Sequence, residues 1–147
     1  MTAGPYKIYT KGFHKVTLQT LDMVGGVLKA MLLDNAHTPD LANHEFVADI
    51  VADEIADVGY ARQTLAGKTN TIVAGKIRVD SNDIDYGDSV TIAARYQAIY
   101  QEVTNDADSP LLALLDLNTA GGNISSTASD FDIAINANGI FEVTLNP

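Results

Sequence analysis

Alternating apolar and polar positions are clearest near the end of the chain. In residues 131–135 and 141–145 an apolar side chain occupies every second position, which is typical of a strand with one buried face. A three-residue loop that ends at Gly139 pairs Ile135 with Phe141 and keeps the apolar residues of both strands on one face. Glycine adopts the left-handed conformation that such a loop requires. The pattern therefore predicts a C-terminal β-hairpin with Gly139 in its turn.

Several earlier segments also have the pattern of strands. Each is short, rich in apolar or β-branched residues, and bounded by Gly, Asp, Asn or Pro. We therefore expect a mainly β chain, folded as an antiparallel β-sandwich or a jelly-roll-like barrel, with one short helix and an N-terminal arm. The predicted strands span residues 27–33, 69–73, 76–80, 90–100 and 111–117.

The short helix is predicted from a segment that follows a different period. Apolar residues recur at helical spacing between positions 46 and 55. Asp40, which follows Thr38-Pro39, is a residue type that caps helix N-termini. We expect the helix over residues 41–51, with its far end either helical or extended before Gly59.

Two of the predicted strands lack a polar face. Apolar side chains occupy nearly every position of residues 111–117, and Lys29 is the one charged residue of 27–33. A strand of an antiparallel sheet normally shows one face to water, and an uncovered apolar strand favours aggregation. Either the helix or a second subunit must cover the extra face. Because one short helix is little cover for two strands, we expect an oligomer whose interface includes Met31, Leu112 and Leu114.

Composition and charge limit the classes of function. The chain has 147 residues, enough for one domain with its own core. Nine Lys and Arg against nineteen Asp and Glu give a formal charge of -10, which disfavours binding to nucleic acid and to anionic membranes. No apolar run approaches the ~18 residues of a membrane-spanning helix. Cysteine is absent, so disulfides and thiolate chemistry are excluded.

The charges are unevenly distributed along the chain. Basic residues gather before the first acid, Asp22, and no Lys or Arg follows Arg95. We expect a basic N-terminal arm, residues 1–15, attached to a single acidic β-rich domain, residues 16–147. The arm is either solvated or docks on an acidic protein surface. The residues expected to make that contact are Lys7, Lys11, His14 and Lys15.

The sequence does not contain the usual catalytic and cofactor motifs with their required spacing. Gly67-Lys68-Thr69 matches the end of a phosphate-binding loop, but Arg62 stands where the motif needs glycine. The histidines do not have zinc-site spacing, and no G-x-S-x-G elbow occurs. We expect no catalytic residues, no metal and no cofactor, and a protein that is not an enzyme.

Residues 80–88 are rich in aspartate. An EF-hand loop needs glutamate eleven residues after its first ligand, and Ala94 stands eleven residues after Asp83. The segment is therefore a turn or an irregular calcium loop, and the turn is the better interpretation because Asp and Asn terminate strands. Arg95 lies between apolar residues within a predicted strand. It either faces solvent or forms a partly buried pair with Asp83 or Asp85 that fixes strand register, with ligand binding a third alternative.

The order of several short sequences resembles a family of small structural proteins of tailed bacteriophages. The resemblance covers about residues 24–145. It is carried by Thr38-Pro39-Asp40, Val58-Gly59-Tyr60, Leu65-Ala66-Gly67-Lys68-Thr69, Thr91-Ile92-Ala93-Ala94-Arg95-Tyr96, Pro110-Leu111-Leu112 and Ala137-Asn138-Gly139-Ile140-Phe141.

The resemblance implies a virion protein, most plausibly a decoration or cement protein on the capsid exterior. Such proteins are β-rich, often trimeric, and seated where capsid subunits meet. It implies the major capsid protein as partner, a homotrimer, synthesis in the host cytoplasm, and no enzymatic activity. The alternatives are another virion component, such as a tail, neck or head fibre protein, or a calcium- or carbohydrate-binding β-sandwich module.

Overall fold

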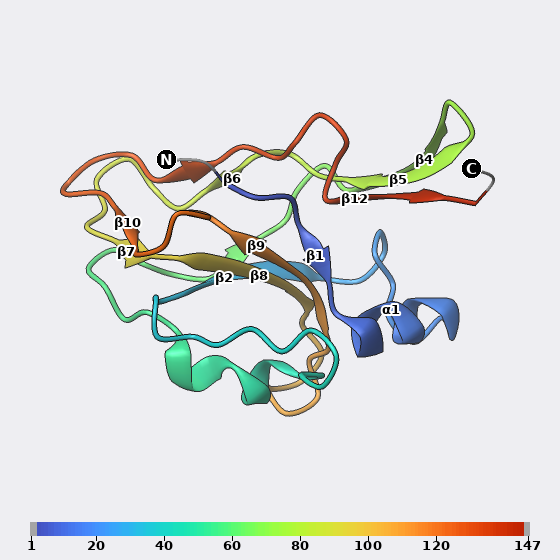
Figure 1. Cartoon of the computed structure of the whole chain (residues 1–147), viewed down its shortest axis with the longest axis horizontal. Coiled ribbons are helices and arrows are strands. Elements are labelled where there is room, and N and C mark those ends of the chain that lie inside the picture. Colours follow the sequence, from blue (N-terminus) through green and yellow to red (C-terminus); the bar gives the residue numbers. More distant parts are fainter. Residues whose placement is uncertain (1–2, 146–147) are drawn as a thin grey trace.

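A five-stranded antiparallel sheet forms the centre of the fold. The computed structural model describes residues 3–145, so residues 1, 2, 146 and 147, at the ends of the predicted arm and domain, lie outside the described residues. The central strands are flanked by a two-residue strand at each edge (Figure 1). In spatial order the strands are β1 (Lys7–Ile8), β9 (Leu111–Asp116), β8 (Tyr96–Gln101), β2 (Leu28–Leu33) and β3 (Gln63–Thr64).

A second layer lies over one face of this sheet (Figure 1). One end of the layer is a three-stranded sheet of β12 (Phe141–Thr144), β5 (Lys76–Asp80) and β4 (Thr69–Val73). The other end contains two short antiparallel pairs. These are β6 (Ile84–Asp85) with β11 (Asp132–Ile133), and β7 (Ala93–Ala94) with β10 (Ile124–Ser125).

The prediction of a mainly β chain with antiparallel sheets and one short helix is confirmed. The sheets of residues 3–145 do not close into a barrel, and their layers fit a sandwich. The predicted strands 27–33, 69–73, 76–80 and 111–117 correspond to β2, β4, β5 and β9. The predicted strand 90–100 is divided into β7 and β8 at Arg95.

The chain itself covers both faces of the central strands. Along β2, Leu32 packs into one apolar cluster, while Met31 and Leu33 pack into a second cluster on the opposite face. Met31, Leu112 and Leu114 are all buried within one chain. The expectation that these three side chains form an oligomer interface is therefore wrong, because a second copy has no access to them.

The α-helix predicted over residues 41–51 is not formed. Short 3₁₀ turns in this part of the chain cover much of the apolar cluster that contains Met31 and Leu33. The turns are η1 (Val47–Asp49) and η2 (Val51–Asp53). The amides that would continue a helix are used elsewhere: Val47 N–H donates to the Ser109 carbonyl and Ala48 N–H to the Asp106 carbonyl. These long-range bonds explain why apolar spacing alone gave the wrong element.

The helix of the structure lies in the segment that was expected to be an arm. Strand β1 pairs with β9, and α1 (Thr10–Thr17) follows it and packs on β9. Gly12 permits this approach, since a Cβ there would collide with the Leu111 carbonyl oxygen. Tyr9 is completely buried between the two elements. Residues 3–15 are thus part of the folded body and do not form a free arm.

The predicted C-terminal hairpin is also wrong, although both of its strands exist. Strand β11 pairs with β6, and β12 pairs with β5. Gly139 does adopt the expected left-handed conformation, with φ +78°, and a Cβ there would collide with the Val79 carbonyl. Period-two alternation fixes which face of a strand is buried, but it does not select the neighbouring strand.

Truncation of the doubly covered β9 strand should destabilise the fold. Leu114→Ala removes buried methyl groups and leaves a cavity, so we expect the free energy of unfolding to fall by about 2–5 kcal/mol. Val58→Ala, at a highly exposed valine, should change it by less than about 0.5 kcal/mol. Urea unfolding followed by circular dichroism measures both values, and equal effects would contradict the assignment of Leu114 to the core.

Candidate interaction surfaces

The three-stranded sheet at one end of the second layer has one apolar face. Cross-strand register places Val143, Ile77 and Ile72 in one row, and Phe141, Val79 and Asn70 in the row nearer the body. The alternation of side chains along each strand puts both rows on the same face of the sheet. The sheet therefore has an inner and an outer apolar row.

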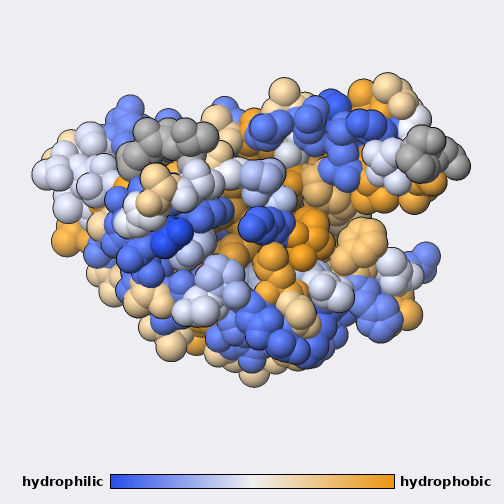
Figure 2. Space-filling view, viewed as in Figure 1, coloured by the Kyte–Doolittle hydropathy of each residue, from blue (hydrophilic) through white to orange (hydrophobic). Residues whose placement is uncertain are grey.

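The apolar residues of the inner row are better covered than Ile72 of the outer row, whose neighbours Ile77 and Val143 are half-buried. Phe141 packs edge-to-face on Phe13 of α1, with ring centroids 6.2 Å apart, so this face turns toward the helix. Beyond the helix, Ile72 is 80% exposed, and Leu145, which follows β12, is 64% exposed. Figure 2 shows this apolar underside above an open notch. We call Ile72, Ile77, Val143 and Leu145 the overhang.

Strand β4 forms an unprotected edge beside the overhang. It is the outermost strand of its sheet, and its sequence TNTIV contains no charge and no proline. Edge strands of this kind accept another strand readily, because their outward backbone groups lack partners in the sheet. The basic residues near it are bonded within the chain: Lys76 and Arg78 pair with Glu142, and Lys68 donates to the Gly26 carbonyl. This end therefore combines an apolar face with an open strand edge, and we call it the hairpin end.

A pocket of about 400 Å³ lies at the opposite end of the second layer. Its wall is held by a chain of side-chain hydrogen bonds. The Tyr6 hydroxyl donates to the side-chain oxygen of Gln97, and the side-chain NH₂ of Gln97 donates to the Tyr86 hydroxyl. The wall is mostly apolar, and Asp132 is its one charged residue. The apolar lining includes Pro5, Leu115, Leu117, Ile124 and Ile133.

Other carboxylates lie near Asp132, the one acid of the pocket wall. Asp132 lies opposite Asp85 in the β6–β11 pair. The pKa of Asp132 is raised, first by loss of solvent and then by the negative charges of Asp85, Asp130 and Asp88. We call the pocket with its acidic neighbours the pocket end.

Two aspartates of residues 80–88 accept backbone N–H groups, one from a distant segment and one within a turn. The Asp83 carboxylate accepts the Ile135 N–H at 2.8 Å, and the Asp85 carboxylate accepts the Gly87 N–H at 2.6 Å. Within residues 3–145, no three His, Asp or Glu side chains are grouped to hold a metal ion. No helix in the same range has the length and apolar character to cross a bilayer.

Arg95 pairs with a different acid from the two that were predicted. Its guanidinium lies 3.3 Å from the Asp116 carboxylate, donates to Asn35 at 2.8 Å, and covers the Tyr96 ring. Asp116 lies close to Arg95 because it is paired across the β8–β9 register with Tyr96, the residue that follows Arg95. The predicted pairing with Asp83 or Asp85 is wrong, since those residues belong to the other layer.

The structure places the predicted basic contact residues on β1 and α1. Lys7 is exposed at the sheet edge, and His14 is exposed on the helix. Lys15 and Lys11 lie 2.8 and 3.5 Å from the Glu45 carboxylate, and the pKa of Glu45 is lowered chiefly by its bond to Lys15. Part of this basic surface is therefore neutralised within the chain.

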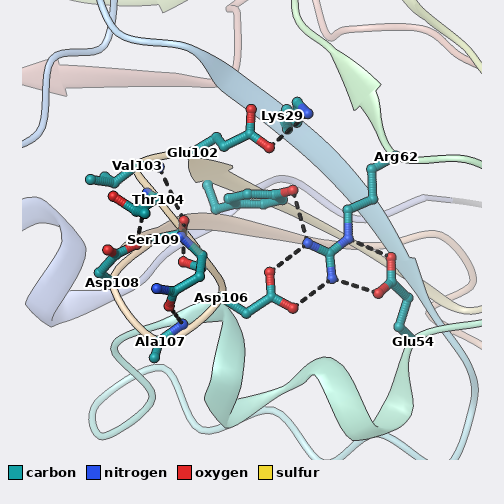
Figure 3. Close-up of polar contacts among 12 residues, drawn as sticks. Lys29, Glu54, Arg62, Glu102, Val103, Thr104, Asp106, Ala107, Asp108 and Ser109 are labelled. Atoms are coloured by element: carbon teal, nitrogen blue, oxygen red, sulfur yellow. Dashed lines mark hydrogen bonds and ion pairs between the residues drawn. The ribbon is translucent and has the colours of Figure 1, made fainter.

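Arg62 is the centre of an ion cluster that sequence spacing did not reveal (Figure 3). Its guanidinium donates to both oxygens of Glu54 at 2.7 and 2.8 Å, to both oxygens of Asp106, and to the Tyr100 hydroxyl. Arg62 also lowers the pKa of Asp106. The cluster fastens two long loops to strand β8 and has a structural role.

Comparison with known proteins found no matching family model, no matching curated protein and no matching solved structure. The surfaces described above are therefore the basis for assigning a function, together with the resemblance noted in the sequence.

The Arg62 cluster should stabilise the fold more than a simple surface pair. The side chains of Arg62 and Arg78 are equally exposed, at 23%, but Arg62 bonds two carboxylates and Arg78 bonds only Glu142. We expect Arg62→Met to lower the free energy of unfolding by about 2 kcal/mol, and Arg78→Met by less than about 1 kcal/mol. Urea unfolding tests both, and equal losses would contradict a special role for the cluster.

The acidic pocket end should be destabilised at neutral pH by its own charges. Since folding raises the pKa of Asp132, its ionisation weakens the folded state as pH rises through the folded pKa. Asp132→Asn should therefore raise the melting temperature at pH 7 and leave it unchanged near pH 3.

Asp108 is the matched control for this experiment. Backbone N–H groups of Asn105 and Thr104 lower its pKa, so its stabilising effect is present at neutral pH and is lost on acidification. Asp108→Asn should lower the melting temperature at pH 7. A shift of the same sign in both variants would contradict the electrostatic account.

Proposed function

We propose that this chain is a structural protein of a tailed-bacteriophage virion, and that it decorates and cements the exterior of the capsid. The major capsid protein is its partner, the chain acts as a homotrimer made in the host cytoplasm, and its role requires no catalytic step. The order of short sequences shared with small phage structural proteins supports this assignment.

The carrying observation is the pair of contact surfaces at opposite ends of the second layer. A cement protein must hold at least two neighbours, and the hairpin end and the pocket end provide two separate surfaces on one small body. Binding to the assembled shell in preference to free subunits stabilises the shell by mass action. Many symmetry-related copies on one lattice multiply a weak individual contact.

The basic side of β1 and α1 is the proposed contact with the capsid. Lys7 and His14 extend from it into solvent, and Lys11 and Lys15 lie beside them. On a chain with formal charge -10, this local basic surface orients the molecule toward an acidic region of the shell.

Labelling of purified virions tests the proposal. Antibodies against this chain, carried on gold particles, should bind the head exterior of the phage whose genome encodes it. Adding the purified chain to heads that lack it should also raise the temperature at which the shell dissociates. Label confined to the tail or neck would favour another virion component, and unlabelled particles would overturn a virion role.

A further inference from the structure

The pocket at the pocket end has the dimensions and the wall of a small-molecule site. Its volume of about 400 Å³ lies within the range of roughly 300–1,000 Å³ that such sites occupy. Pro5, Leu115, Leu117, Ile124 and Ile133 make the wall mostly apolar. A ligand with a hydrocarbon body can therefore be enclosed here and is stabilised by its removal from water.

The chain holds this pocket open through bonds of its own. The N-terminal segment on one side is fixed at two points. The Gly4 N–H donates to the Asp116 carbonyl at 2.8 Å, and the Tyr6 hydroxyl donates to the side-chain oxygen of Gln97. Gln97 is completely buried, so the second bond ties the segment to the centre of strand β8. A preformed pocket spares a ligand the free energy of ordering its own site.

One carboxylate lines the pocket, and the described part of the chain provides no basic partner for it. Asp132 is the one charged residue of the wall, and its neighbours across and along the strand are also acidic. Within residues 3–145, these acids form no ion pair with Lys, Arg or His; they are Asp85, Asp88, Asp130 and Asp132. A cation that reaches Asp132 therefore meets a carboxylate without a competing partner.

These two features select a ligand by its chemistry. A neutral hydrocarbon would leave the carboxylate without a partner, and an anion would be repelled by it. A metal ion would leave the apolar wall unused, and within residues 3–145 no three His, Asp or Glu side chains are grouped to hold one. An ammonium group on a hydrocarbon body satisfies both features, because its N–H groups donate to the carboxylate while its carbon atoms contact the wall.

We propose that the pocket end binds a small organic cation. The ammonium group lies at the Asp132 carboxylate, and the hydrocarbon part lies against Leu115, Ile124 and Ile133. This site goes beyond the virion role and does not depend on it, because the pocket and its charge belong to a single chain.

Benzylammonium, benzyl alcohol and benzoate test this proposal, because they share one ring and differ in charge. An apolar cavity of about 150 Å³ holds benzene, so the pocket has room for each probe. NMR titrations of the ¹⁵N-labelled chain at pH 7 should show shifts of the Gly4, Ile124 and Ile133 amides. We expect a dissociation constant of about 1 mM for benzylammonium, a value at least about 10-fold higher for benzyl alcohol, and no binding of benzoate.

Asp132→Asn removes the charge from the wall with almost no change of shape. It should lower the affinity for benzylammonium about 10-fold, to that of benzyl alcohol, and leave the affinity for benzyl alcohol unchanged. Asp108→Asn is the matched control, since it changes the net charge by the same amount on the loop between β8 and β9, outside the pocket wall. It should leave the affinities for all three probes unchanged, and circular dichroism should show both variants folded.

Three results would overturn the proposal. The first is equal affinity of the unaltered chain for benzylammonium and benzyl alcohol, since the carboxylate would then contribute nothing. The second is the same affinity for benzylammonium in both variants. The third is the absence of saturable shifts at the pocket amides below about 10 mM benzylammonium.

Discussion

The burial of β2, β8 and β9 on both faces is the constraint on which the rest of the structure depends. Three adjacent strands of nearly continuous apolar sequence require two covers, and the chain provides both. The second β layer, with Val16 of α1, covers one face, and Tyr9 with the 3₁₀ turns covers the other. Long connections are needed to reach the second face, and Arg62 fastens two of them to the sheet. The Arg62 cluster is thus needed because the central strands must be covered on both faces.

Local pattern predicted the strands well and their arrangement poorly. Residues 69–73 and 76–80 were predicted with the bounds they have, because short apolar or β-branched runs between turn residues are a local signal. The helix was misplaced because Tyr9, Phe13 and Val16 also have helical spacing, in a segment that charge suggested was an arm. The pairing of β12 with β5 depends on residues more than sixty positions apart, which a local pattern cannot select.

The candidate surfaces were visible in the sequence only in part. Lys7, Lys11, His14 and Lys15 were recognised from charge, but Glu45 could be paired with two of them only once the fold was known. The apolar residues were assigned to the wrong surface for a physical reason: an apolar strand looks the same whether the chain or a partner covers it. Ile72 lies in a polar, unremarkable sequence, and its exposure follows from the position of β4 at a sheet edge.

The pocket wall has a further consequence for the order of events in the cell. Residues from the first ten positions of the chain form this wall together with residues after position 114, and the Gly4 N–H bonds the Asp116 carbonyl at 2.8 Å. The cavity therefore takes shape only after the chain as far as Asn136 has left the ribosome and the N-terminal residues have docked against it.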